Sequence, residues 1–164
     1  MIEISPRTFR DTLGRYPTGV CVITMVDADG KWQGVTIGSF ASLSLDPPLV
    51  QFSLDKSAIC HPAFINCEKF AVNVLAEDQS DLSGIFASKQ AERPWGDVKT
   101  RIGESGAPLL EGACAVIECE REAVYPGGDH DIIVGRVIAL DQAVDGRPLI
   151  YFGAGYRSLN TVEV

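Results

Sequence analysis

Histidine, methionine and tryptophan are scarce in this chain of 164 residues, with two of each. Basic residues are also outnumbered: 14 lysines and arginines face 22 acidic residues, which gives a formal net charge of −8 at pH 7. A nucleic-acid binder normally carries a basic patch or stripe, and no lysine and arginine cluster is present. The same lack of positive charge disfavours a membrane surface. We therefore expect neither nucleic acid nor a membrane as a partner.

Long apolar runs are missing too. None approaches the ~18 to 20 residues of a membrane-spanning helix, and residues 1–10 lack the apolar region of a secretory signal. The cysteines number five, an odd count, and form no C-x-x-C pair, so neither a disulfide framework nor a zinc ribbon is expected. Reduced cysteines are typical of cytoplasmic proteins, and the sequence predicts that location.

Familiar catalytic motifs are absent as well. The chain has no G-x-S-x-G elbow and no Walker loop. The run Gly153-Ala154-Gly155 begins a G-x-G-x-x-G pattern, but Ser158 replaces the last glycine. Too few residues follow for the helix and second strand of a dinucleotide fold, which excludes that reading.

Both histidines lie in short polar clusters. Asp129, His130 and Asp131 are adjacent, and neighbouring residues of a strand point to opposite faces, so no metal site is predicted there. Cys60 and His61 are also adjacent, but adjacency does not place a base within reach of a thiol. A Cys–His nucleophile stays open beside the alternative of two ordinary residues of a short helix.

The residues that are present predict one globular domain over residues 1–164. Apolar residues make up 46% and charged residues 22%, an ordinary globular composition. Helices are expected from Pro6, capped by Ser5, to about Tyr16, and near residues 57–66 and 79–88. Strands are expected at 20–26, 31–39, 49–54, 70–75, 113–124, 130–140 and 149–152. Many strands with few crossover helices favour a mainly β fold, a closed antiparallel barrel.

One segment, residues 36–50, is rich in small hydroxyl residues and ends in two prolines. It is either a loop that makes its own backbone turns or a platform for a flat ring with polar edges. In the second case Gly38 lets backbone approach the ring, and Ser39 and Ser42 bind its edge atoms. Composition alone leaves both interpretations open.

Two further pieces could support a ligand. Ser57 can cap the helix that follows, and with Lys56 beside it a phosphate site is one interpretation, a plain cap the other. Phe86 is followed by Lys89, an aromatic residue and then a cation. A glycine turn delivers His130 onto a strand, either as a site residue or as a surface histidine of a hairpin.

These pieces, taken in order, resemble the flavin reductase-like family, the small reductase components of two-component flavin monooxygenases. The resemblance extends from about Phe9 to Leu159. Its specificity comes from the order of the pieces over the full length. They are Pro17-Thr18-Gly19-Val20, residues 36–50 with their Ser-Leu-Asp-Pro-Pro run, Lys56-Ser57, residues 70–75, Gly106-Ala107-Pro108-Leu109, Glu118-Cys119, Gly128-Asp129-His130, Gly135-Arg136-Val137 and Pro148-Leu149-Ile150-Tyr151.

The resemblance implies a homodimeric FMN-binding split barrel with each flavin near the subunit interface. It implies FMN, or FAD, as the cofactor and NADH or NADPH as the hydride donor. His130 is then the residue that positions the nicotinamide, with no acid–base role. The implied cofactor-binding residues are Thr36, Gly38, Ser39, Ala41 and Ser42 for the flavin ring, Lys56, Ser57 and Lys89 for phosphate, and Ser53, Phe86, Asp129, Tyr156 and Arg157 beside them.

One departure from the family lies in residues 37–40. Many relatives carry Ala-Asn-Ser-Phe where this chain has Ile37-Gly38-Ser39-Phe40, so the asparagine amide is lost as a flavin contact. Hydride transfer needs the nicotinamide held near the flavin, and the cofactor carries the chemistry. That requirement is consistent with a sequence that shows no acid–base triad.

Three functions fit the resemblance. The first is an NAD(P)H:flavin oxidoreductase that supplies reduced flavin to a separate monooxygenase. The second retains its FMN and reduces another acceptor, such as a corrin cobalt in cobalamin biosynthesis. The third is a flavin- or haem-binding barrel without enzymatic activity. Trp95 either covers a bound ring or packs as an ordinary core or surface residue.

Overall fold

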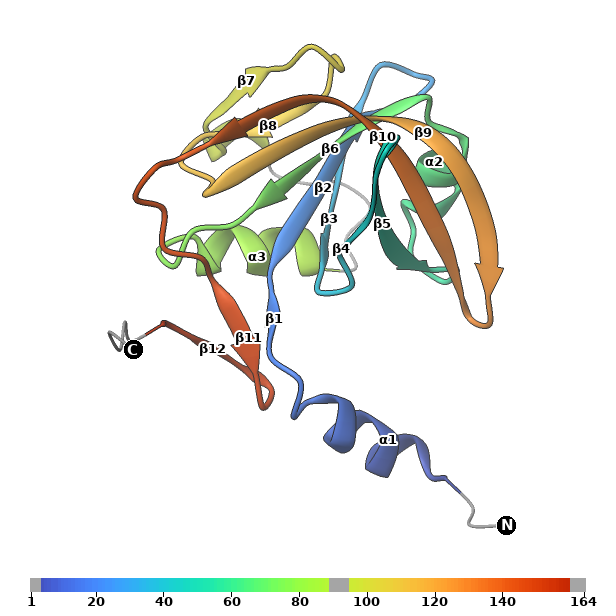
Figure 1. Ribbon diagram of the computed structural model, residues 1–164, viewed down its shortest axis with the longest axis vertical. Coiled ribbons are helices and arrows are strands. Elements are labelled where there is room, and N and C mark those ends of the chain that lie inside the picture. The colour runs from blue at the N-terminus through green and yellow to red at the C-terminus, as the bar shows by residue number, and fades with distance from the viewer. Residues whose placement is uncertain (1–3, 89–94, 160–164) are drawn as a thin grey trace.

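An antiparallel sheet of seven strands dominates the fold, in the order β3-β2-β6-β9-β10-β5-β4 (Figure 1). The computed structural model describes residues 4–88 and 95–159. The predicted mainly β class is confirmed. The strands are β2 (Cys21–Val26), β3 (Trp32–Ile37), β4 (Ala41–Leu45), β5 (Pro48–Asp55), β6 (Lys69–Val74), β9 (Ala115–Gly127) and β10 (His130–Gln142).

Smaller elements surround this sheet. A three-stranded sheet joins β1 (Thr18–Gly19), β11 (Ile150–Phe152) and β12 (Gly155–Arg157), and a two-stranded one joins β7 (Thr100–Ile102) and β8 (Pro108–Leu110). The helices are α1 (Pro6–Leu13), α2 (His61–Asn66) and α3 (Ser80–Ala87), with a 3-10 turn at Trp95–Asp97. No helix in the described ranges is both long and apolar enough to cross a bilayer.

Alternation along β5 builds the main core. Val50, Phe52 and Leu54 are buried, while the residues between them are half-buried on the opposite face. The Phe52 ring meets the ring of Phe64 in α2 and that of Phe70 in β6, with centroids 6.4 and 5.4 Å apart. Aromatic rings in such edge-to-face contacts add to the stability that their burial provides. This cluster holds α2 against the inner face of the sheet.

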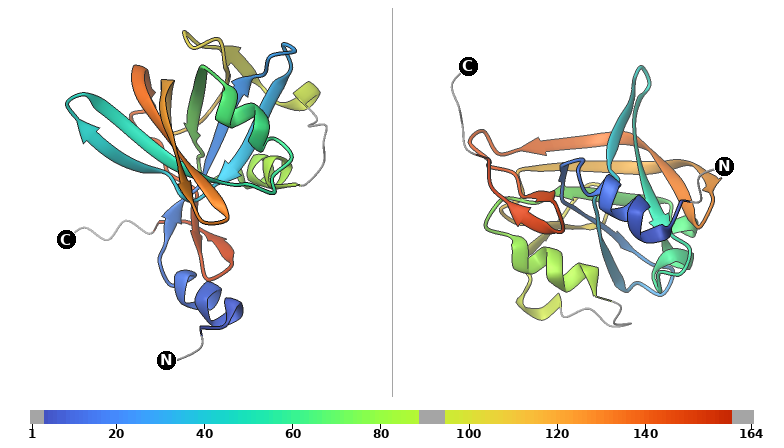
Figure 2. Two further views of the ribbon diagram at one scale, coloured as in Figure 1. Left: turned by 90° about the vertical axis from the view of Figure 1, so that its right-hand side faces the viewer. Right: turned by 90° about the horizontal axis from the view of Figure 1, so that it is seen from below.

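A serine hydroxyl ties the first part of the sheet to β5. Ser39, two residues beyond β3, donates its Oγ–H to the carbonyl of Ser53 at 3.0 Å and accepts the Ser53 N–H at 2.9 Å. The strands β3 and β5 are not neighbours in the hydrogen-bonded order, so this contact links two parts of the curled sheet. The β4–β5 hairpin beyond it projects from the sheet (Figure 2).

A second cluster places α3 on β3. Phe86 of α3 is buried, and its ring packs on Trp95 with centroids 4.9 Å apart. The Trp95 ring also meets Trp32 edge-on and donates its Nε1–H to the Trp32 carbonyl at 3.1 Å. A Cβ built on Gly34 would lie only 2.5 Å from the Phe86 ring, so glycine is required for this close approach. Trp95 is therefore a packing residue.

Two local predictions need correction. The loop alternative for residues 36–50 is wrong, because they include the strand β4, which pairs with β5 through a turn at the cis Asp46-Pro47 bond. The helix expected from Ser57 begins at His61, and its N-cap is Cys60. The Asp55 carboxylate accepts the Ser57 N–H at 2.7 Å, so a turn occupies the place of the expected first helical residues.

The first helix stands away from the rest of the chain (Figures 1 and 2). Ser5 caps it as predicted, accepting the Thr8 N–H at 3.1 Å. None of the residues described for α1 is buried, and Phe9 and Leu13 are each 55% exposed. An amphipathic helix normally buries its apolar face, so this face is left for another surface.

Replacement of Gly34 by alanine tests the packing of α3. We expect Gly34→Ala to lower the free energy of unfolding by about 1–3 kcal/mol, because the added methyl group overpacks the buried Phe86 ring. Urea denaturation measures the change. Gly84→Ala is the matched control, since Gly84 lies on the open side of α3 with nothing near its Cβ position. Alanine should stabilise that position by about 0.5–1 kcal/mol. Equal effects at both positions would contradict the packing argument.

Candidate functional site

Strand pairing decides which predicted residues face one another. In the β5–β10 pair, Ser53 lies opposite Ile132 and Asp55 lies opposite His130. Directly opposed residues of an antiparallel pair share a face, and residues two apart along a strand share it as well. Ser53 and His130 therefore lie on the same face, away from the core that Phe52 and Leu54 enter.

The next strand extends this face. Ala41 of β4 lies opposite Gln51 of β5, two residues from Ser53, so Ala41 shares the face of Ser53 and His130. We call the surface formed by Ala41, Gln51, Ser53 and His130 the outer face of β5. It brings together residues predicted for the flavin and for the nicotinamide.

The turn into β10 fixes the His130 ring. Gly128 has a φ of 75°, a backbone conformation that glycine adopts readily. The His130 Nδ1 lies 2.8 Å from the Asp129 carboxylate oxygen. An ionised carboxylate only accepts hydrogen bonds, so Nδ1 is the donor and Nε2 of the neutral ring is left as an acceptor. The half-exposed ring can thus bind a donor group on a ligand.

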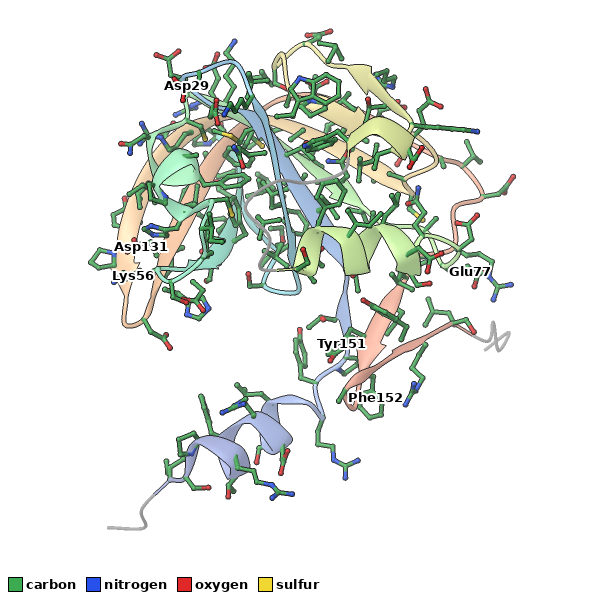
Figure 3. All side chains as sticks on the ribbon, turned by 180° about the vertical axis from the view of Figure 1, so that it is seen from behind. Asp29, Lys56, Glu77, Asp131, Tyr151 and Phe152 are labelled. Carbon is green, nitrogen blue, oxygen red and sulfur yellow. The ribbon has the colours of Figure 1, made fainter. Side chains whose placement is uncertain are left out.

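The side chains of Lys56 and Asp131 meet on the opposite face (Figure 3). The Lys56 Nζ donates to the Gly128 carbonyl at 2.7 Å and lies 3.5 Å from one Asp131 oxygen. The other Asp131 oxygen lies 2.8 Å from Nε2 of His61, the buried first residue of α2. The hydrogen bond from His61 and then the nearby Lys56 charge lower the pKa of Asp131, which is therefore ionised at neutral pH.

The residues predicted for a phosphate site, Lys56 and Ser57, contact other groups in this structure. The Lys56 ammonium contacts the Gly128 carbonyl and the Asp131 carboxylate, whose negative charge disfavours an added phosphate. Ser57 does not begin a helix, because α2 starts four residues later. Lys89 lies outside the described residues.

The remaining residues of the expected platform are engaged in different ways. Thr36 donates its hydroxyl to the carbonyl of Ser83 in α3 at 2.8 Å. The Ser39 hydroxyl is occupied by Ser53, while Ser42 is exposed. A Cβ on Gly38 would lie 3.0 Å from the Thr18 Oγ1, so glycine lets the end of β3 approach β1.

The C-terminal residues converge on α3. Tyr156 donates its hydroxyl to Ser83 Oγ at 2.8 Å, and its ring lies edge-on to Tyr151, with centroids 5.7 Å apart. Arg157 donates to the Tyr156 carbonyl at 2.7 Å. Ser83, which the sequence reading missed, thus joins Thr36 and Tyr156. Its place three residues before Phe86, on the same side of the helix expected at 79–88, was the available signal.

The ring of Phe86, a predicted cofactor-binding residue, faces the core. Its ring is only 1% exposed and fills the space between Trp95 and the backbone of Gly34. It therefore supports α3 from the core, and a cofactor would reach it only if that packing opened.

Comparison with known proteins places the chain in a family. The family described as "Flavin reductase like domain" matches residues 13–160. The chain belongs to this family. The resemblance drawn from the ordered motifs is confirmed.

Individual relatives agree with this membership. The chain is 43% identical over 150 residues to an Agrobacterium fabrum protein named FMN reductase (NADH) SmoA, covering 92% of the chain and 84% of the relative. It is 40% identical over 159 residues to the Mycobacterium tuberculosis reductase subunit HsaB of a flavin-dependent monooxygenase, covering 96% and 84%. A solved NADH:FAD oxidoreductase of Streptomyces globisporus has a TM-score of 0.91 at 33% identity and covers 99% of both chains.

A hollow beside β1 adds residues that were not among the predicted site residues. Its volume is about 680 Å³. Its wall includes Leu13, the last residue of α1, Tyr16 just after that helix, Thr18 of β1 and Tyr151 of β11. Thr18 also contacts the space beside Gly38, so the hollow adjoins the expected platform. Thr18 belongs to the Pro-Thr-Gly motif quoted for the family, which was the signal for it.

Three buried cysteines of this flavin reductase family member are poor nucleophiles. Burial raises the pKa of Cys21 and Cys119 to about 12 and that of Cys67 to about 11. Within the described part of the chain, none of the five cysteines forms a disulfide. Cys60 and His61 are both buried, so a Cys–His nucleophile there would have no open access to a substrate.

Thiol titration tests this burial. Four cysteines are buried and Cys114 is partly exposed, so we expect Ellman's reagent to label Cys114 within minutes in the native protein and the others only slowly. In guanidinium chloride all five should react at once. Cys114→Ser should abolish the fast phase and leave the slow reaction unchanged. A second fast thiol in that variant would show that the core opens more readily than its packing indicates.

Proposed function

We propose that this chain transfers a hydride from NADH to FMN or FAD and supplies the reduced flavin to a separate monooxygenase. The observation that carries the proposal is the outer face of β5, which presents Ala41, Ser53 and His130 together. The relatives support it by name: one is an NADH-dependent FMN reductase and another is a monooxygenase reductase subunit. A related structure is described as a complex with NAD and FAD fragments.

The segment from Gly38 to Ser42 suits a flat ring system. Gly38 and Ala41 carry little or no side chain, so a ring can approach the backbone, whose N–H and C=O groups suit the polar ring edge. The exposed Ser42 hydroxyl adds a donor and an acceptor. A flavin bound there supplies the atom that accepts the hydride. Two hydroxyl groups hold this segment in place. Ser39 donates to the carbonyl of Ser53, and Thr36 donates to the carbonyl of Ser83.

His130 is suited to hold the nicotinamide end of the donor. Its Nδ1 is bound to Asp129, so Nε2 can accept a hydrogen bond from the carboxamide N–H of a nicotinamide. This contact orients the donor and moves no proton. Hydride transfer depends on the reacting atoms lying close and aligned, so positioning is the contribution required of the protein.

NADH is the preferred donor in this proposal. A protein that reads the 2′-phosphate of NADPH places an arginine near it, and the sequence shows no arginine cluster. The names of the relatives specify NADH as well.

The exposed first helix supports a homodimer. Phe9 and Leu13 of α1 form an apolar face that the described part of the same chain leaves uncovered. A second copy of the chain would bury this face and wall the neighbouring hollow, whose lining includes Leu13 and Tyr16. Because the hollow adjoins Gly38, the flavin would then lie near the subunit interface.

A steady-state assay tests the activity. We expect the purified protein to oxidise NADH at a rate that saturates with added FMN. The loss of absorbance of the reduced nicotinamide measures this rate. FAD should also serve, and NADPH should give a lower kcat/KM. Flavin binding without any NADH oxidation would instead support a carrier, and a retained flavin that turns over only with another acceptor would support the second alternative.

A charge placed on α1 tests the dimer. We expect Leu13→Asp to raise the dimer dissociation constant at least about tenfold, because it buries an unpaired carboxylate in the interface. Sedimentation equilibrium measures this dissociation constant, because the dimer has twice the mass of one chain. Thr12→Asp is the matched control, since it adds the same charge at the next position around the helix. Wild-type protein that sediments as a monomer would reject the homodimer.

A further inference from the structure

One polar cluster has no part in the mechanism above. His61 at the start of α2, Asp131 in β10 and Lys56 after β5 meet on the face of the sheet opposite to His130. His61 is 8% exposed, and the Asp131 side chain is 15% exposed. Groups of this polarity are costly to bury unless they bind one another, so their arrangement calls for a role.

The cluster is fastened to the turn that carries His130. The Lys56 Nζ donates to the Gly128 carbonyl at 2.7 Å, and the Lys56 backbone N–H donates to the Asp129 carbonyl at 3.0 Å. Asp131 follows His130 directly and binds both His61, at 2.8 Å, and Lys56, at 3.5 Å. Contacts thus reach the turn on both sides of His130.

The turn needs such support. It lies at the end of a long hairpin, where Gly127 and Gly128 bring conformational freedom and little burial. A hydride donor must be held closely, and a displacement of about 1 Å can cost about a hundredfold in rate. Charge-assisted hydrogen bonds are roughly twice as strong as neutral ones, which suits them to fix an exposed turn.

We propose that His61 and Asp131 are positioning residues for His130, and that Lys56 anchors the His130 turn in place of holding a flavin phosphate. Asp131 orients Lys56, and His61 orients Asp131 from the buried end of α2. The inference rests on the proposed function, because it takes His130 as the residue that meets the nicotinamide.

The two roles of Lys56 give opposite results with two flavins. FMN carries a phosphate and riboflavin does not. If Lys56 anchors the turn, Lys56→Met leaves the Kd of both flavins within about twofold and raises the KM for NADH about tenfold, the loss expected for one charge-assisted hydrogen bond. If Lys56 holds phosphate, the same variant weakens FMN alone and leaves the KM for NADH unchanged, which would overturn the proposal.

Lys69→Met is the matched control. Lys69 lies 3.4 Å from Glu120 in an ion pair, and its side chain is 40% exposed, as is that of Lys56. It lies at the start of β6, away from the His130 turn. We expect Lys69→Met to leave the KM for NADH unchanged. An equal rise in Lys69→Met and Lys56→Met would mean that the KM responds only to the net charge of the protein, which would overturn the anchoring role.

His61 and Asp131 are tested together with His130. We expect Asp131→Asn and His61→Ala each to raise the KM for NADH, and His61→Gln to restore most of the loss because its amide N–H can reach Asp131. Combined with His130→Ala, Asp131→Asn should add nothing further, since the residue that it positions is gone.

Equal thermal melting of the Lys56→Met variant and wild type excludes unfolding as the cause.

The outcomes separate this inference from the activity. Wild-type protein that does not reduce flavin with NADH would reject the proposed function itself. Normal wild-type activity with an unchanged KM in Lys56→Met and Asp131→Asn would reject the anchor alone. Fully additive losses in the double variant, or an unchanged KM in His130→Ala, would likewise overturn the positioning role.

Discussion

The unbroken register between β5 and β10 is the constraint on which the site depends. The pairing continues without a shift from Arg136 opposite Leu49 to His130 opposite Asp55. Because side chains alternate along a strand, a slip of one residue would exchange the two faces and bring Asp131 out and His130 in. The buried residues of β10 prevent this slip, since the fully buried Ile133 would then have to leave the core. Hydrophobic packing therefore decides which polar groups a ligand can meet.

The helix α3 connects the packed core to residues 36–42, the expected flavin platform. Phe86 seats the helix against Gly34, and three residues earlier Ser83 offers its carbonyl to Thr36 and its hydroxyl to Tyr156. One helix thereby aligns the end of β3 with the C-terminal strand. Such side-chain bonds specify geometry more than they add stability, because each replaces a hydrogen bond to water.

Much of this arrangement follows from local sequence, and the rest does not. Strand alternation located β5 and β10, and the glycine turn located His130, since both patterns are set by neighbouring residues. The strand β4 was missed because its residues are largely exposed and show no apolar alternation. The partners of Lys56 were missed for a different reason: the His61–Asp131 bond joins positions 70 apart in the sequence, a pairing that only the fold reveals.

The exposed helix α1 has a consequence for the hollow beside β1. A helix of eight residues is marginal in water by itself, and none of the described residues of α1 is buried. In the proposed homodimer, the partner surface that covers Phe9 and Leu13 would stabilise it. The same helix forms part of the wall of the hollow. In the proposed homodimer the shape of that hollow is linked by mass action to assembly, and the affinity of a ligand within it becomes a function of protein concentration.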